Sequence, residues 1–199
     1  PWVWVLGRYI FDFYALLYPI LAAILSYSLC DVEYKNYGFR LLFTRPISKL
    51  TIYSSKMVFL LEINFISFLI GYLAFLLSGF ALDKLLPGYE FSSYNVNNLT
   101  AFYFSYLFIA LSAVSIMQYY LSLIFKSFVL PIGFAGFMTI FGVIAQNKDY
   151  IYLIPYGTVW RLNYGFYSGI IDFSKGEYLN ISCVLFFIII SFFVFIRKK

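Results

Sequence analysis

The chain has 199 residues, of which 63% are hydrophobic and 12% are charged, and its mean hydropathy of +0.85 lies far above that of soluble globular domains. Basic residues outnumber acidic ones by 14 to 9, and the sequence has no histidine, which leaves little for a zinc site or for general acid–base catalysis. This composition excludes a water-soluble domain and weighs against an intramembrane metalloenzyme.

Apolar blocks follow one another along the chain, each close to the length that an α-helix needs to cross a hydrocarbon core of about 30 Å. The predicted spans cover residues 11–30, 57–82, 101–125, 128–146 and 178–196. We therefore predict an all-α, polytopic transmembrane helical bundle that forms a single domain over residues 1–199. The apolar pieces within residues 147–177 are too short to span, and we predict that they form an extracytoplasmic segment of interfacial or re-entrant half-helices.

The distribution of basic residues predicts the orientation of the spans, because Lys and Arg accumulate on the cytoplasmic side. Residues 31–56, Lys126 and the C-terminal Arg197-Lys198-Lys199 carry five, one and three basic residues, which are nine of the 14 in the chain. Placing these three segments inside puts the C-terminus in the cytoplasm. Five spans with this polarity also predict one further span upstream, and hence six spans with both ends cytoplasmic.

The segment DVEYKNYGFRLLFTRPISKLTIYSSK, residues 31–56, lies between the first two predicted spans and is strongly basic. It contains the pattern E-x4-G-x7-P-x-S-x4-Y-x2-K, formed by Glu33, Gly38, Pro46, Ser48, Tyr53 and Lys56. This pattern resembles the signature of ABC-2 type transporter permeases, and the order of the visible spans is similar to spans two to six of that family. The resemblance implies a type V exporter-like bundle. It extends to the small bacterial permeases of lantibiotic (bacteriocin) immunity and related peptide or drug export.

The resemblance also implies that residues 31–56 couple the bundle to an ATPase. The implied coupling residues are Glu33, Lys35, Gly38, Arg40, Arg45, Pro46, Lys49 and Lys56. Within residues 34–44, apolar side chains fall near one helical face and polar ones largely on others, which suits a coupling helix at the membrane surface or in a partner's groove. The alternative interpretation is that the basic residues only anchor the chain to anionic lipid and fix its topology.

Several partners follow from the resemblance. The sequence has no G-x4-G-K-[ST] loop, so we expect a separate ABC ATPase subunit to bind ATP and magnesium, and this chain to hold no cofactor, metal or catalytic residue. We expect a second permease subunit, identical or not, in a bacterial cytoplasmic membrane. Spans with almost no charge favour export of a peptide, lipid-like or hydrophobic substrate. The alternative is a non-catalytic membrane scaffold or assembly subunit that docks a cytoplasmic partner.

Glu62 is an acid inside a predicted span, and such acids are costly in a bilayer and often functional. One interpretation places it in an ion pair or on a substrate path. The other is that it reaches the membrane surface or a neighbouring polar group, because it lies about 9 Å along the helix from Lys56. Cys30 and Cys183 are predicted near opposite membrane faces, so we expect no disulfide between them.

Overall fold

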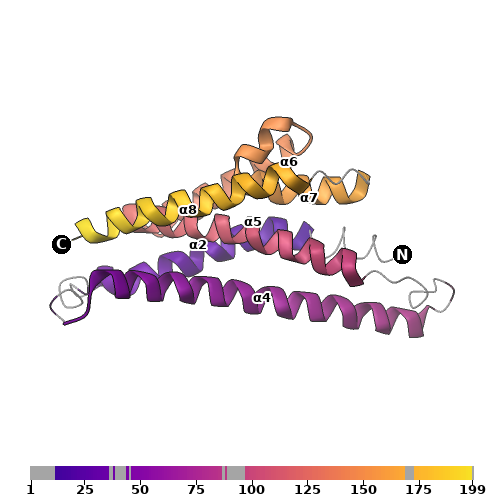
Figure 1. Ribbon diagram of the computed structural model, residues 1–199, viewed down its shortest axis with the longest axis horizontal. Helices are drawn as coiled ribbons and strands as arrows, with labels where there is room; N and C mark the ends of the chain where they lie inside the picture. Colours follow the sequence, from indigo (N-terminus) through magenta and orange to yellow (C-terminus); the bar gives the residue numbers. More distant parts are fainter. Residues whose placement is uncertain are drawn as a thin grey trace.

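The computed structural model describes residues 12–35, 38, 44, 46–86, 88, 97–168 and 173–198, with backbone alone described at 97–99, 149, 163–168 and 173–177. Its elements are α2 (Asp12–Tyr34), α4 (Lys49–Leu85), α5 (Asn97–Ile124), α6 (Val129–Ala145), the 3-10 helix η5 (Asp149–Leu153), α7 (Pro155–Ser168) and α8 (Phe173–Arg197). The described part of the chain contains no strand. The long helices lie roughly side by side in an elongated bundle (Figure 1).

Four helices are long and apolar enough to cross a membrane: α2, α4, α5 from Thr100, and α8 from Tyr178. The apolar helix α6 has 17 residues and is therefore about 26 Å long, somewhat shorter than a hydrocarbon core. Helix α4 has 37 residues and runs along almost the whole bundle, so it begins before and ends after the predicted span (Figure 1). The prediction of an all-α polytopic membrane bundle is confirmed.

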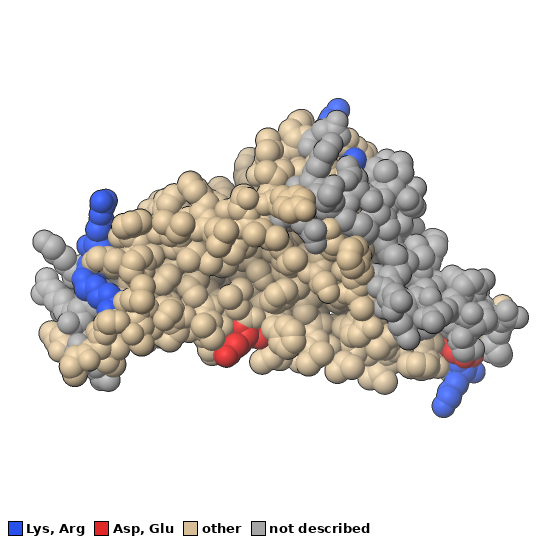
Figure 2. All heavy atoms as spheres, in the orientation of Figure 1, with Lys and Arg blue, Asp and Glu red and all other residues tan. Residues whose placement is uncertain are grey.

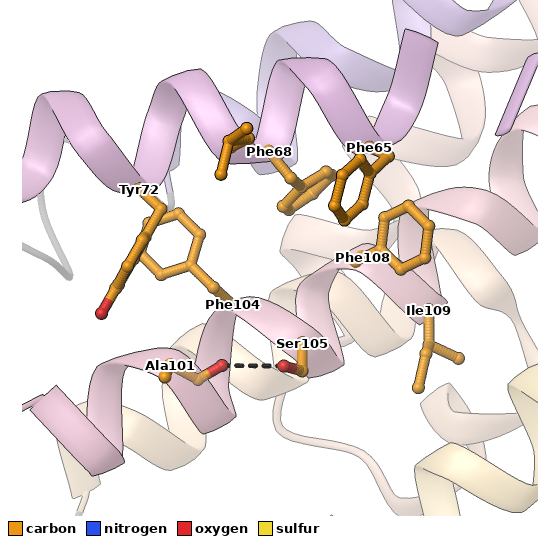
Figure 3. A pocket seen from close by; sticks show the side chains of 9 residues that line it. Phe65, Phe68, Tyr72, Ala101, Phe104, Ser105, Phe108 and Ile109 are labelled. Atoms are coloured by element: carbon orange, nitrogen blue, oxygen red, sulfur yellow. Dashed lines mark hydrogen bonds between the residues drawn. The ribbon is translucent and has the colours of Figure 1, made fainter. Parts of the chain in front are cut away.

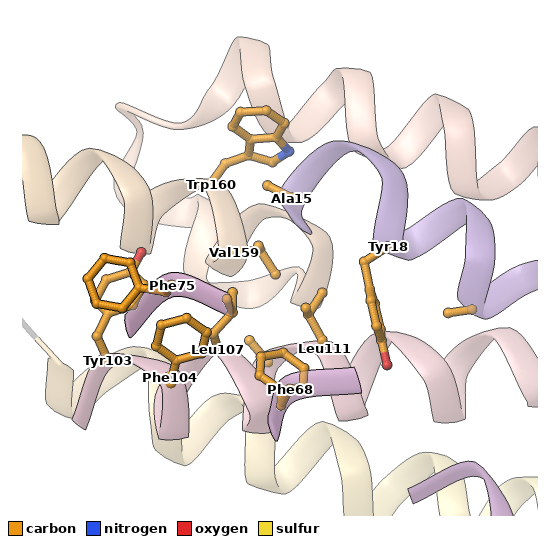
Figure 4. Close-up of a cluster of buried hydrophobic side chains, with 12 residues drawn as sticks. Ala15, Tyr18, Phe68, Phe75, Tyr103, Phe104, Leu107, Leu111, Val159 and Trp160 are labelled. Carbon is orange, nitrogen blue, oxygen red and sulfur yellow. The ribbon is translucent and has the colours of Figure 1, made fainter. Parts of the chain in front are cut away.

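Helix α5 is the centre of the bundle. Of its span, 67% is buried among the other helices, against 17% of the spans in α4 and α8. One cluster of buried side chains joins α5 to three other helices (Figure 4), and it includes Tyr18 of α2, Phe68 and Phe75 of α4, Tyr103, Leu107 and Leu111 of α5, and Val159 and Trp160 of α7. The contacts of α5 therefore hold the other helices in place.

Helices α6 and α7 form a short pair that packs against α2 and α5. A methyl group added at Gly142 of α6 would lie 2.6 Å from Cδ1 of Trp160, so a glycine is needed for the two helices to approach this closely. Beyond the end of α6, the Arg161 side chain donates a hydrogen bond to the carbonyl oxygen of Gln146 over 3.3 Å. These contacts fix the turn between the two helices.

Asn64 of α4 joins three helices through hydrogen bonds within the bundle. Its Oδ1 accepts a hydrogen bond from the hydroxyl of Tyr18 in α2, and its Nδ2 donates to Oγ of Ser115 in α5 over 3.0 Å. Asn64 and Ser115 are both buried. Hydrogen bonds of this kind hold membrane helices together where no water competes for the polar groups.

Replacing Asn64 with leucine is expected to lower the free energy of unfolding by about 1 kcal/mol, because the Tyr18 and Ser115 hydroxyls lose their partner on α4. Unfolding by sodium dodecyl sulfate in lipid–detergent micelles measures the change. Asn147→Leu is the matched control, since Asn147 is exposed after α6 and its replacement is expected to change stability by less than about 0.5 kcal/mol. Equal losses in the two variants would show that the hydrogen bonds of Asn64 contribute nothing.

Candidate functional site

One end of the bundle gathers positive charge. Lys35, Lys49, Lys56, Lys126 and Lys198 lie there, where α2 ends, α4 begins and α8 ends, and we call this the basic end. Figure 2 shows Lys and Arg side chains at this end, on the left, and beside them a long surface of uncharged side chains that is interrupted by one acidic patch. The basic end contains the two ends of the segment 31–56, which the sequence singles out.

Glu33 and Lys56 form an ion pair between the last turn of α2 and the start of α4. Oε1 of Glu33 lies 2.6 Å from Nζ of Lys56, and the two side chains are 9% and 13% exposed. Nζ of Lys56 also donates a hydrogen bond to the carbonyl oxygen of Leu29 over 2.7 Å. The second carboxylate oxygen of Glu33 is buried without a hydrogen-bond partner in the described structure. Each charge therefore depends on the other, because a lone buried charge is strongly unfavourable.

Gly38 lies directly against the end of α2. A methyl group added at this position would lie 2.9 Å from Cα of Glu33 and 3.0 Å from the carbonyl oxygen of Val32. Both contacts are with backbone atoms, which cannot turn aside as a flexible side chain can. A glycine is therefore needed for the backbone at position 38 to lie this close to the end of α2.

The start of α4 is defined by Ser48. Its Oγ accepts a hydrogen bond from the backbone N–H of Thr51 over 3.0 Å, as expected of an N-cap serine, and Pro46 is exposed just before it. Nζ of Lys49 donates to the carbonyl oxygen of Ile196 in the last turn of α8 over 3.0 Å. A cation at that position is favourable, because the C-terminal end of a helix carries partial negative charge.

Two tyrosines complete the contacts between helices at the basic end. The hydroxyl of Tyr34 lies 2.8 Å from the carbonyl oxygen of Ser122 in α5. The hydroxyl of Tyr53 donates to the carbonyl oxygen of Ile188 in α8 over 2.7 Å. The sequence places Tyr34 on an apolar face and Tyr53 in the motif, but neither position indicates an anchor between helices.

Lys198 is a further residue of this end that the sequence gives only as part of a basic tail. Its Nζ lies 5.1 Å from the centre of the Tyr34 ring and 3.4 Å from the Tyr34 hydroxyl. Burial lowers the pKa of Lys198, and the nearby charge of Lys126 lowers it further. The C-terminal end of α8 is thereby packed onto the end of α2.

Among the remaining implied coupling residues, the structure describes Lys35, which lies at the basic end just after α2. Lys35 is exposed and pairs with Asp31 one turn earlier, and the hydrogen bond from Lys35 to Asp31, together with the charge of Asp31, raises the pKa of Lys35. Arg40, Arg45 and most of the predicted coupling helix lie outside the described residues. The structure thus brings together Glu33, Gly38 and Lys56, and joins Lys49 to α8.

A comparison of this sequence with models of known protein families identifies the family of the chain. The model described as ABC-2 family transporter protein matches residues 3–142, more than half of the chain. The chain belongs to the ABC-2 transporter family. Neither the curated proteins nor the solved structures contain a match.

The match places this ABC-2 family member among multi-pass membrane proteins, in agreement with its apolar helices. The matched residues include α2, α4, α5 and most of α6, and with them the Glu33–Lys56 pair and Ser48. The resemblance drawn from the motif in residues 33–56 is therefore confirmed at the level of the family. Helices α7 and α8 lie beyond the matched residues.

Proposed function

We propose that this chain is the permease subunit of an ATP-driven exporter. A separate ABC ATPase subunit docks at the basic end and itself binds and hydrolyses ATP with magnesium. The segment 31–56 passes the movement of this ATPase subunit to the bundle. Membership of the ABC-2 family supports a transport role, and the coupling step is an inference from the geometry of this segment.

The observation that carries the proposal is the buried ion pair between Glu33 and Lys56. These residues lie at the two ends of the segment that would meet the ATPase, and their pairing ties the end of α2 to the start of α4. Lys49 and Tyr53 extend the connection from α4 to α8. A force on the segment would therefore move α2, α4 and α8 together. A segment that only anchors the chain to lipid would not need these connections between helices.

The other parts of the proposal concern the surroundings of the chain. We place the basic end and the C-terminus in the cytoplasm of a bacterial cell, and we pair the chain with a second permease subunit so that two ATPase subunits each have a partner. The cargo is a peptide, a lipid-like molecule or a hydrophobic compound, because the spans, apart from Glu62, offer almost no charge to bind a small hydrophilic ion or a sugar.

Purification of the tagged chain from its native membrane tests the assembly. The expected result is a complex of two permease and two ATPase subunits whose ATPase component carries a G-x4-G-K-[ST] loop. A complex with a soluble protein that lacks this loop would instead make the chain a membrane scaffold, and would overturn the proposal.

Replacing Gly38 with alanine is expected to reduce substrate-stimulated ATP hydrolysis by the complex about tenfold or more, because the added methyl group displaces the segment from Glu33. Gly136→Ala in α6 is the matched control, since a methyl group there meets no atom within 4 Å. Hydrolysis is measured in proteoliposomes at equal amounts of inserted protein. Unchanged stimulation in Gly38→Ala would count against coupling through this segment.

A further inference from the structure

An aromatic groove lies between α4 and α5 (Figure 3). Its volume is about 470 Å³, within the usual range of about 300 to 1,000 Å³ for small-molecule sites. Its aromatic walls are formed by Phe65, Phe68 and Tyr72 of α4 and by Phe104 and Phe108 of α5. The one hydroxyl on the α5 side, that of Ser105, donates to the carbonyl oxygen of Ala101 in its own helix over 2.8 Å. The groove therefore suits an apolar body.

Glu62 lies at the end of this groove nearer Lys56. It precedes Phe65 by three residues and Leu69 by seven, so the three side chains lie along one face of α4. Glu62 is exposed, and among the described residues nothing forms an ion pair or hydrogen bond with it. Phe65, one turn further along, is 58% exposed. A carboxylate on an apolar helix face inside a predicted span is costly unless a partner neutralises it.

We propose that Glu62 and the groove between α4 and α5 together bind a cationic amphiphile. The carboxylate of Glu62 pairs with the cationic group, the apolar body lies among the aromatic rings, and the rings add attraction to the cation. A neutral or anionic molecule would leave the carboxylate unpaired. The inference rests on the proposed function, because it identifies the class of molecule that such an exporter would move.

Equilibrium dialysis with the permease chain in nanodiscs of phosphatidylcholine, which has no net charge, tests the proposal. The probes are tetraphenylphosphonium and tetraphenylborate, which have nearly the same size and opposite charge, and empty nanodiscs give the background. After subtraction of the binding to empty nanodiscs, we expect the permease to bind tetraphenylphosphonium at least about tenfold more tightly than tetraphenylborate. Equal binding of the two ions would overturn the proposal.

The variants assign the charge preference to one residue. Glu62→Gln is expected to weaken tetraphenylphosphonium binding about tenfold or more, and Glu62→Asp, which keeps the charge, is expected to retain most of it. Asp83→Asn is the matched control, since it removes a carboxylate from the far end of the same helix and is expected to leave binding unchanged. Unchanged binding by Glu62→Gln, or loss of binding in a Glu62→Asp variant that still folds, would contradict the assignment.

A second copy of the chain is the competing occupant of this face of α4. A Leu69→Cys variant whose Cys30 and Cys183 are replaced with serine distinguishes the two, because Leu69 is 48% exposed and lines the groove. We expect tetraphenylphosphonium to protect the introduced thiol from a thiol-specific reagent. Efficient oxidation to a cross-linked pair of chains, unaffected by the probe, would show that a second copy covers the groove and would overturn the proposal.

The binding measurement is independent of the ATPase. Probe binding that is lost in Glu62→Gln supports the groove site even when no ATPase co-purifies, in which case the exporter role alone fails. Normal coupling through Gly38 without selective probe binding overturns the groove site and leaves the exporter role standing.

Discussion

Replacing Lys56 with methionine is expected to lower the free energy of unfolding by about 3 to 5 kcal/mol, because it leaves the Glu33 carboxylate buried without its partner. The variant also loses the hydrogen bond from Nζ to the carbonyl oxygen of Leu29. Unfolding by sodium dodecyl sulfate in lipid–detergent micelles measures the loss. The end of α2 is expected to separate from α4, so substrate-stimulated ATP hydrolysis should fall as well.

Two further variants separate the ion pair from a general effect of removing a lysine. Lys35→Met removes the exposed partner of Asp31 and is expected to change stability little, since solvent screens that pair. Adding Glu33→Gln to Lys56→Met removes both charges and is expected to recover much of the lost stability. Equal losses in Lys35→Met and Lys56→Met, or no recovery in the double variant, would contradict the role assigned to the pair.

The helical architecture follows from the sequence because it depends on local properties. Blocks of apolar residues of spanning length are recognisable wherever they occur, and they predict the helices of the bundle. The residues at which each helix begins and ends depend also on contacts between side chains, which cannot be inferred from hydropathy. Helix α4 begins before its apolar block because Ser48 caps it, and because the Tyr53 hydroxyl and the Lys56 ammonium find partners on α8 and α2.

The candidate site is only partly predictable. The motif identifies Glu33 and Lys56 as important, yet their pairing is a contact between helices whose partners are 23 positions apart in the sequence. The hydrogen bonds of Tyr34 to α5 have no periodic signature for the same reason. Glu62 is recognisable as an unusual acid within an apolar block, but the groove beside it forms only when α4 packs on α5.

Replacing Leu107 with alanine is expected to lower the free energy of unfolding by about 2 to 5 kcal/mol. Leu107 is fully buried in the cluster that joins α5 to the other helices, as Figure 4 shows, so its removal leaves a cavity where four helices meet. The same unfolding titration measures the effect. A loss of this size would identify α5 as the element on which the bundle depends.

Leu77→Ala is the matched control for Leu107→Ala, because it removes the same atoms from a leucine of α4 that is 68% exposed. A lipid-facing side chain that is shortened leaves no cavity, since acyl chains fill the space, and the expected change is below about 0.5 kcal/mol. Similar losses of unfolding free energy in the two variants would mean that packing around α5 contributes no more to stability than contact with lipid does. A large difference would instead show that side-chain packing within the bundle holds α2, α4 and α7 around α5. Movement of the segment 31–56 would then have to change this packing in order to move the helices.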